Sequence, residues 1–120
     1  MSYCSDIIYQ QLGGNRFAKL TGSKNFTFDK KSLTFAIIPN QSKATHITIE
    51  YNYNADDYTI HFIRYVRGRI IETVDGVIQT PNSRTVLVTR DGIYFDELLP
   101  TIQDITGIAT TVPRIKGINV

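Results

Sequence analysis

Cysteine is almost absent from this sequence, and long apolar runs are missing altogether. The one cysteine, Cys4, excludes a disulfide within the chain and fits a reducing compartment. No apolar run approaches the roughly 18 residues that a membrane-crossing helix needs, so we expect no membrane partner. The first ten residues, MSYCSDIIYQ, lack the basic flank and apolar segment of a signal peptide. We therefore expect a cytoplasmic protein.

Groupings of side chains that carry chemistry are also scarce. His46 and His61 lie in strand-like segments without cysteine or carboxylate partners at metal-ligand spacing, which argues against a metal site. Asp56 and Asp57 form the one adjacent carboxylate pair, in a turn that favours aspartate for backbone reasons. Cys4 falls in a terminus that we expect to be flexible, a poor place for a nucleophile. The sequence predicts no enzyme, no cofactor and no small-molecule substrate.

Alternating apolar and polar residues cover most of the chain and predict strands. In THITIEY, for example, Ile47 and Ile49 fall on one side and Thr48 and Glu50 on the other. Gly13 and Gly14 precede such a pattern, so they lack the geometry of a phosphate-binding loop. The expected strands are residues 16–21, 25–29, 33–38, 45–51, 58–66, 69–74 and 85–90, with DGVIQTPNS (75–83) as a loop.

A helical pattern occurs once, near the end of the chain. Its apolar residues follow the i, i+3, i+4, i+7 rule and are Phe95, Leu98, Leu99, Ile102 and Ile105. Gly107 is a natural stop, and Pro100 should kink or divide the helix. The fold class that follows is α+β, an antiparallel β-meander followed by one C-terminal helix that covers the sheet. We expect one domain, 1–120, with its core at about 12–107 and with Phe35, Phe62 and Phe95 inside. For the tail, 108–120, three alternatives stay open: an edge strand, an arm that reaches a partner subunit, or a disordered segment.

Charge is distributed unevenly along the chain. Up to Thr45 there are six basic residues against two acids, a net +4, whereas the remainder holds seven basic residues against nine acids, a net −2. An asymmetric basic half suggests an anionic partner, nucleic acid first. The alternative is a solvated strand face, because lysines on sheet edges also discourage aggregation.

Aromatic residues stand beside basic ones in three places. Phe17 neighbours Arg16, Phe26 and Phe28 share a strand with Lys24, and Tyr65 is flanked by Arg64 and Arg67. Single-stranded nucleic acid is held by this combination, since cations follow the phosphates and exposed rings stack on bases. The simpler alternative is that Phe17, Phe26 and Phe28 belong to the core and the arginines to a solvated face.

The stretch LGGNRFAKLTGSKNF (12–26), followed by SLTF (32–35), resembles a family of small phage and prophage proteins with a Leu-Gly-Gly-Asn-Arg-Phe and Thr-Gly signature. The expected element order is also similar to single-stranded DNA-binding proteins of the positive-cofactor-four and Whirly group. The resemblance implies a curved sheet, with a C-terminal helix that packs across a dimer interface. It also implies binding of single-stranded or melted DNA in phage replication, recombination or late transcription, inside a bacterial host. The segment 70–90 departs from the family as an added strand pair.

Two hypotheses follow. In the first, the protein is a phage single-stranded DNA-binding protein that acts as a homodimer or larger homo-oligomer. In the second, it is a phage structural or protein-interaction module without nucleic-acid binding. For the first, the candidate nucleic-acid-binding residues are Asn15, Arg16, Phe17, Lys19, Lys24, Phe26, Phe28, Lys30, Lys31, Arg64, Tyr65 and Arg67.

Overall fold

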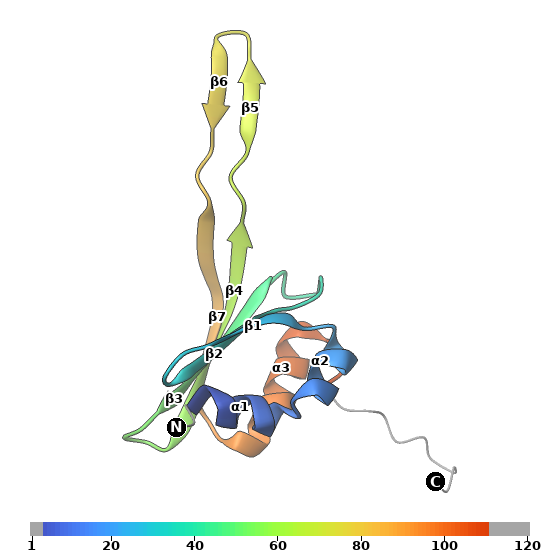
Figure 1. Ribbon diagram of the computed structural model, residues 1–120, viewed down its shortest axis with the longest axis vertical. Coiled ribbons are helices and arrows are strands. Elements are labelled where there is room, and N and C mark those ends of the chain that lie inside the picture. The colour runs from blue at the N-terminus through green and yellow to red at the C-terminus, as the bar shows by residue number, and fades with distance from the viewer. Residues whose placement is uncertain (1–3, 111–120) are drawn as a thin grey trace, which may run out of the picture.

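The computed structural model describes residues 4–110 and combines helices with an antiparallel sheet (Figure 1). The helices are α1 (Cys4–Leu12), α2 (Asn15–Thr21) and α3 (Leu98–Thr106), with a 3-10 turn, η1 (Phe95–Glu97), directly before α3. The strands are β1 (Lys24–Phe28), β2 (Ser32–Ala36), β3 (His46–Asn52), β4 (Asp57–Val66), β5 (Ile70–Thr73), β6 (Gly76–Gln79) and β7 (Ser83–Ile93). The α+β class with a C-terminal helix is confirmed.

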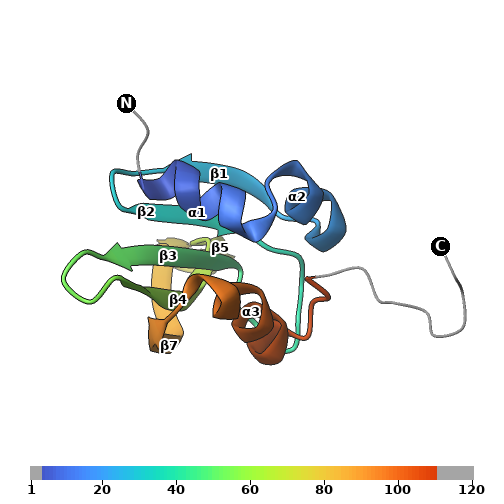
Figure 2. The same cartoon turned by 90° about the horizontal axis from the view of Figure 1, so that it is seen from below.

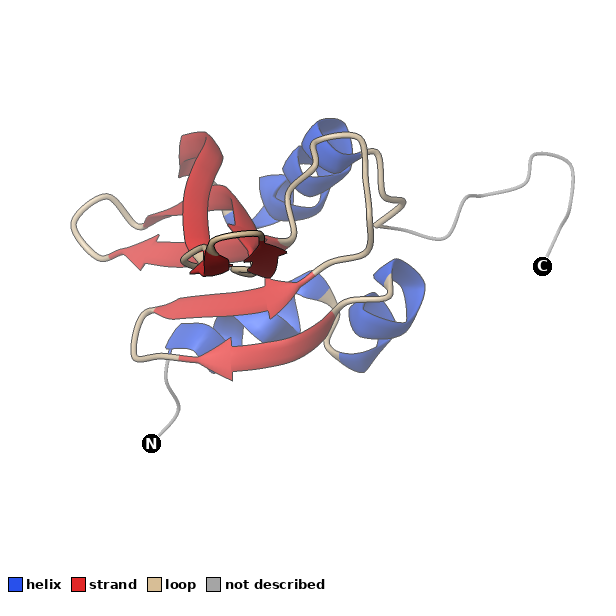
Figure 3. Ribbon diagram, turned by 90° about the horizontal axis from the view of Figure 1, so that it is seen from above, coloured by secondary structure: helices blue, strands red, loops and turns tan. Residues whose placement is uncertain are grey.

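Five of these strands form one antiparallel sheet in the order β1-β2-β3-β4-β7. The predicted alternation in β3 is confirmed, because Ile47 and Ile49 are fully buried while Thr48 and Glu50 lie on the other, more open face. All three helices contribute to the core beneath the buried face (Figures 2 and 3). The core residues are Ile8, Leu12, Phe17, Leu33, Phe35, Ala44, Ile47, Ile49, Tyr58, Ile60, Phe62, Leu98 and Ile102.

The N-terminal segment differs from the prediction. Residues 16–21 form helix α2, not a strand, and a second unpredicted helix, α1, precedes it. Gly13 and Gly14 separate the two helices with positive φ, and Gly22, at φ 70°, ends α2 in the left-handed conformation. The alternation that suggested a strand is thus a short helix whose buried residues, Phe17 and Thr21, are four apart. The core also begins earlier than residue 12, since Ile8 is fully buried.

Two expectations about the C-terminal helix need correction. Phe95, expected in the core, is 64% exposed because it lies in η1, ahead of α3. Pro100 neither kinks nor divides α3, because it is the third residue of that helix. In the first turn a backbone N–H has no acceptor within the helix, so proline costs little there. Gly107 ends α3 at φ 75°, as predicted. Most of the predicted tail, 111–120, lies outside the described residues.

β4 and β7 continue past the sheet into a projecting arm that ends in the β5–β6 hairpin (Figure 1). Residues 75–83, predicted as a loop, include strand β6, so the segment 70–90 contains β5, β6 and part of β7 and not the predicted strand pair. Gly68 joins the stem to the hairpin, and a Cβ on it would lie 1.9 Å from the Thr80 carbonyl oxygen. No helix among residues 4–110 is long and apolar enough to cross a membrane.

Candidate nucleic-acid interface

The base of the arm places an aromatic ring between basic side chains. Tyr65 on β4 is paired directly with Arg84 on β7, and Arg64 is paired with Thr85. The Arg84 guanidinium donates a hydrogen bond from Nε to the Tyr65 hydroxyl at 3.2 Å. Because directly paired residues of an antiparallel ladder share a face, Tyr65 and Arg84 present a ring and a cation side by side.

Tyr65 is also fixed from the neighbouring strand. The His46 ring packs edge-on against it with the centroids 4.7 Å apart, and the Tyr65 backbone N–H donates to the Thr45 hydroxyl at 2.9 Å. The Tyr65 side chain nevertheless stays 42% exposed. Burial lowers the pKa of His46 from its ordinary value of 6.5, which favours the neutral imidazole. Tyr65 is therefore an ordered, partly exposed ring, and the positive charge near it comes from residues other than His46.

Those other residues are basic. A groove at the arm base is lined by Lys43 and Arg64 together with Tyr65 and the apolar Ile37 and Pro39. Along the sequence, no acid occurs in 64–71 or in 76–90. We call Lys43, Arg64, Tyr65 and Arg84 the arm-base cluster. Its composition, one accessible ring with Arg84 beside it and with Lys43 and Arg64 along the adjoining groove, suits a phosphate backbone with an unstacked base.

Of the predicted residues on α2, the polar ones lie on the surface and the aromatic one lies in the core. Asn15, Arg16 and Lys19 line a shallow hollow on the outer side of α2, and the Asn15 side-chain oxygen accepts the Tyr9 hydroxyl at 2.8 Å. Phe17, expected to contact DNA, is instead 2% exposed and packs edge-on against Phe35 at 5.6 Å. In the folded protein Phe17 is a core residue and offers no stacking surface.

The predicted residues around β1 are likewise dispersed. Phe26 stacks on Phe35 with centroids 5.1 Å apart, and both Phe26 and Phe28 meet the edge of Tyr9, at 5.0 and 5.6 Å. Both rings pack against other aromatic rings of the protein, although Phe28 remains 41% exposed. Lys24 begins β1, whereas Lys30 and Lys31 lie in the turn at its other end. Of the twelve predicted residues, Arg64 and Tyr65 join the arm-base cluster, and the exposed Arg67 follows in the link between β4 and β5.

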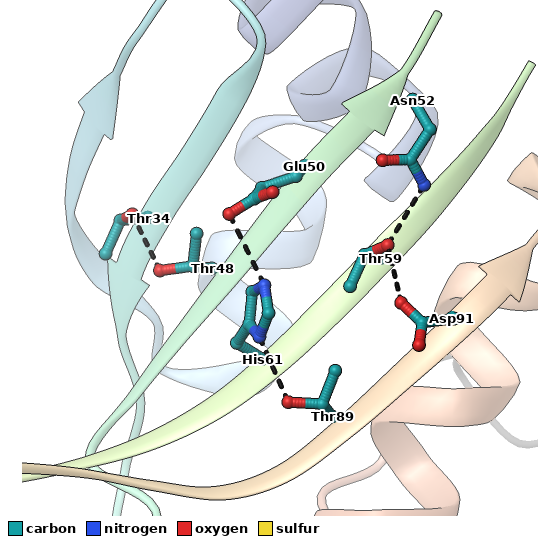
Figure 4. Close-up of polar contacts among 8 residues, drawn as sticks. All are labelled: Thr34, Thr48, Glu50, Asn52, Thr59, His61, Thr89 and Asp91. Atoms are coloured by element: carbon teal, nitrogen blue, oxygen red, sulfur yellow. Dashed lines mark hydrogen bonds and ion pairs between the residues drawn. The ribbon is translucent and has the colours of Figure 1, made fainter. Parts of the chain in front are cut away.

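Away from the arm, the open face of the sheet carries hydrogen-bonded polar side chains that include the carboxylates Glu50 and Asp91 (Figure 4). Threonines bond each other across β2 and β3, Thr34 to Thr48 at 2.9 Å. Nearer the β3–β4 turn, Thr59 donates to the Asp91 carboxylate at 3.0 Å and accepts from the Asn52 amide at 2.9 Å. Carboxylates on this part of the face disfavour the binding of phosphate. We therefore place the candidate interface at the arm base and not on the open face of the sheet.

Glu50, His61 and Thr89 form a carboxylate–imidazole–hydroxyl series on the same face (Figure 4). His61 Nε2 lies 3.3 Å from the Glu50 carboxylate, and His61 Nδ1 lies 3.1 Å from the Thr89 hydroxyl. One residue comes from each of three adjacent strands, where the backbone N–H groups lie in the plane of the sheet and cannot converge on an oxyanion. We interpret the series as cross-strand pairing that stabilises the sheet. Among residues 4–110, no group of three or more His, Cys, Asp or Glu could hold a metal.

Sequence reasoning missed Lys43 and Arg84. Arg84 is 19 positions from Tyr65 in the chain and reaches it only through the β4–β7 register. Lys43 lies in the β2–β3 connection, where its φ of 67° belongs to a turn. The signal that could have found Arg84 is the acid-free composition of 76–90, a strand segment with two arginines.

Comparison of the chain with known protein families, with curated proteins and with solved structures finds no significant match.

Proposed function

We propose that this protein binds single-stranded nucleic acid at the arm-base cluster. The observation that carries the proposal is Tyr65, a half-exposed ring held by His46 and Arg84 in a stretch of chain without acids. A base can stack on such a ring while Lys43, Arg64 and Arg84 take the neighbouring phosphates. Stacking of this kind is tolerant of sequence, because every base has a π-face.

A single strand fits this site better than a duplex does. Bases in a duplex are already stacked on one another, so an exposed tyrosine gains little from them. The resemblance to phage proteins and to the positive-cofactor-four and Whirly group points the same way, toward single-stranded DNA in a phage replication, recombination or late-transcription role. A positive-cofactor-four-like curved sheet is part of the same proposal, and so is a homodimer, whichever surface of the chain forms it.

The test is fluorescence anisotropy with labelled single-stranded DNA, RNA and duplex DNA across a salt series. Three cations at the cluster predict a log–log salt slope of about −2 for each bound chain. Binding to single strands that weakens with salt, and weaker binding to duplex, would support the proposal. No binding of any oligonucleotide at low salt would reject it.

The second candidate function is a phage structural or protein-interaction module. The exposed aliphatic side chains of the β5–β6 hairpin favour it, since Ile70, Val74 and Val77 are each at least 66% exposed. Soluble monomers rarely display apolar clusters of this kind without a partner. Rejection of oligonucleotide binding, together with a defined assembly in solution, would select this function.

A further inference from the structure

The end of the arm is a two-stranded ribbon with aliphatic side chains on both of its faces. β5 pairs with β6 so that Ile71 lies opposite Ile78, while Glu72 lies opposite Val77. Every residue of both strands is exposed. An isolated two-stranded hairpin is marginally stable in water, and packing of an apolar face against another surface is the usual remedy. The β5–β6 hairpin extends the β4–β7 pair and exposes aliphatic side chains, so packing of one of its faces against another surface would stabilise it.

One face of this ribbon is better suited to packing than the other. Ile70 and Val77, paired on this face with Gln79 and Glu72, are 71% and 66% exposed. Ile71 and Ile78, on the opposite face, are 45% and 52% exposed. Burial of the more exposed pair removes more apolar surface from water, so we expect the Ile70–Val77 face to be the covered one.

Charge along the arm identifies the kind of partner. The outer part, 70–83, carries Glu72 and Asp75 and no lysine or arginine. The link below it carries Arg67 and Arg69 and no acid. An arm with an acidic tip and a basic link is complementary to itself when two copies lie antiparallel, because each tip then meets the partner's link.

We propose that two copies of this chain associate through their arms, laid antiparallel with the Ile70–Val77 faces in contact. The two-fold axis passes near the aliphatic residues, and the contacts of Glu72 and Asp75 with the partner's Arg67 and Arg69 close both ends. An apolar centre with charged ends is the usual composition of a protein interface. The arm-base cluster lies nearer the sheet than this contact, so the proposal stands independently of nucleic-acid binding.

Sedimentation velocity of the full chain, without nucleic acid, tests the proposal. The wild type should be a dimer at micromolar concentration, and Ile70→Thr with Val77→Thr should raise the dimer Kd by about tenfold or more. Ile71→Thr with Ile78→Thr is the matched control on the opposite face and should remain dimeric. Threonine retains strand propensity, so both variants can form the hairpin. A monomeric wild type, or equal weakening by both pairs, would overturn the proposal.

Charge reversal gives a sharper readout. Glu72→Lys with Asp75→Lys, and separately Arg67→Glu with Arg69→Glu, should each be monomeric because like charges then meet at both ends. Mixing the two variants should restore a dimer that contains one copy of each. The control Asp29→Lys with Asp104→Lys makes the same change in charge as Glu72→Lys with Asp75→Lys, at exposed positions away from the arm, and should leave the dimer intact. Failure of the mixed pair to associate, or a dimer that survives in either variant alone, would overturn the proposal.

Discussion

Arg84 on β7 and Tyr65 on β4 are joined side chain to side chain, the guanidinium Nε donating to the phenol oxygen at 3.2 Å across a directly paired position of the sheet. The contact helps to order the ring, and it places a permanent positive charge beside that ring. His46 packs edge-on against Tyr65, and burial favours the neutral form of its imidazole by lowering its pKa. The proposed binding site depends on this arrangement.

Replacement of Tyr65 should reveal how much the ring contributes. Tyr65→Leu removes a stacking surface worth about 1–3 kcal/mol per base, so affinity for single-stranded DNA should fall roughly 5- to 150-fold. The salt slope should stay unchanged, because no cation is lost. Tyr65→Phe keeps the ring and should bind within a few-fold of the wild type. Anisotropy titrations measure both, and wild-type affinity in Tyr65→Leu would refute the stacking role.

Phe17 should matter for stability and not for binding. Its side chain is 2% exposed, so Phe17→Ala should lower the free energy of unfolding by about 3–5 kcal/mol in urea denaturation. Phe28→Ala, at a ring that is 41% exposed, should cost clearly less. Equal losses in the two variants, or an unaltered Phe17→Ala, would contradict the burial of this ring beneath the sheet.

Gly68 should be required for the arm. A methyl group at this position would stand 1.9 Å from the Thr80 carbonyl oxygen, so Gly68→Ala must displace the link between β4 and β5. Hydrogen exchange should then become faster in 69–80, while amides of β3 keep their protection. Val74→Ala, at a fully exposed side chain, is the control and should change neither. Unaltered exchange in Gly68→Ala would contradict the close approach.

His46 predicts a dependence of stability on pH. Burial lowers its pKa in the folded state, so the unfolded chain binds the proton more readily. The stability that results is fully present above the unfolded pKa of about 6.5 and is lost as pH falls below it toward the folded pKa. Urea denaturation at pH 7.5 and 5.5 should show a smaller loss in His46→Gln than in the wild type. An identical loss in both proteins would contradict the prediction.

The sequence predicted the parts of the fold in which the apolar residues follow one clear period, that of a strand or that of a helix. β3 alternates strictly between core and open face, and the stop of α3 at Gly107 follows from the glycine itself. The N-terminus was misread because Arg16–Leu20 alternates over too few residues to separate a strand from a helix. Ile8 and Leu12, four apart and both buried, were the helical signal for α1 that was available.

The candidate site was less predictable because it depends on register. Tyr65 and Arg64 are adjacent in the chain and were found, whereas Arg84 joins them only when β4 and β7 pair. The rings of Phe17 and Phe26 were assigned to a surface because composition cannot tell an exposed aromatic from a buried one. Their partners, Phe35 and Tyr9, come from other elements of the fold.

The most direct measurement compares two double variants with the same loss of charge. Arg64→Ala with Arg84→Ala removes two of the three cations of the arm-base cluster, and Arg16→Ala with Lys19→Ala removes the exposed cations of α2. Anisotropy with a labelled single strand should show a Kd at least about tenfold higher, and a salt slope shallower by about 1.4, for the first variant alone. Circular dichroism confirms that each is folded. Wild-type binding by the Arg64/Arg84 variant, or a larger loss in the Arg16/Lys19 variant, would contradict an interface at the base of the arm.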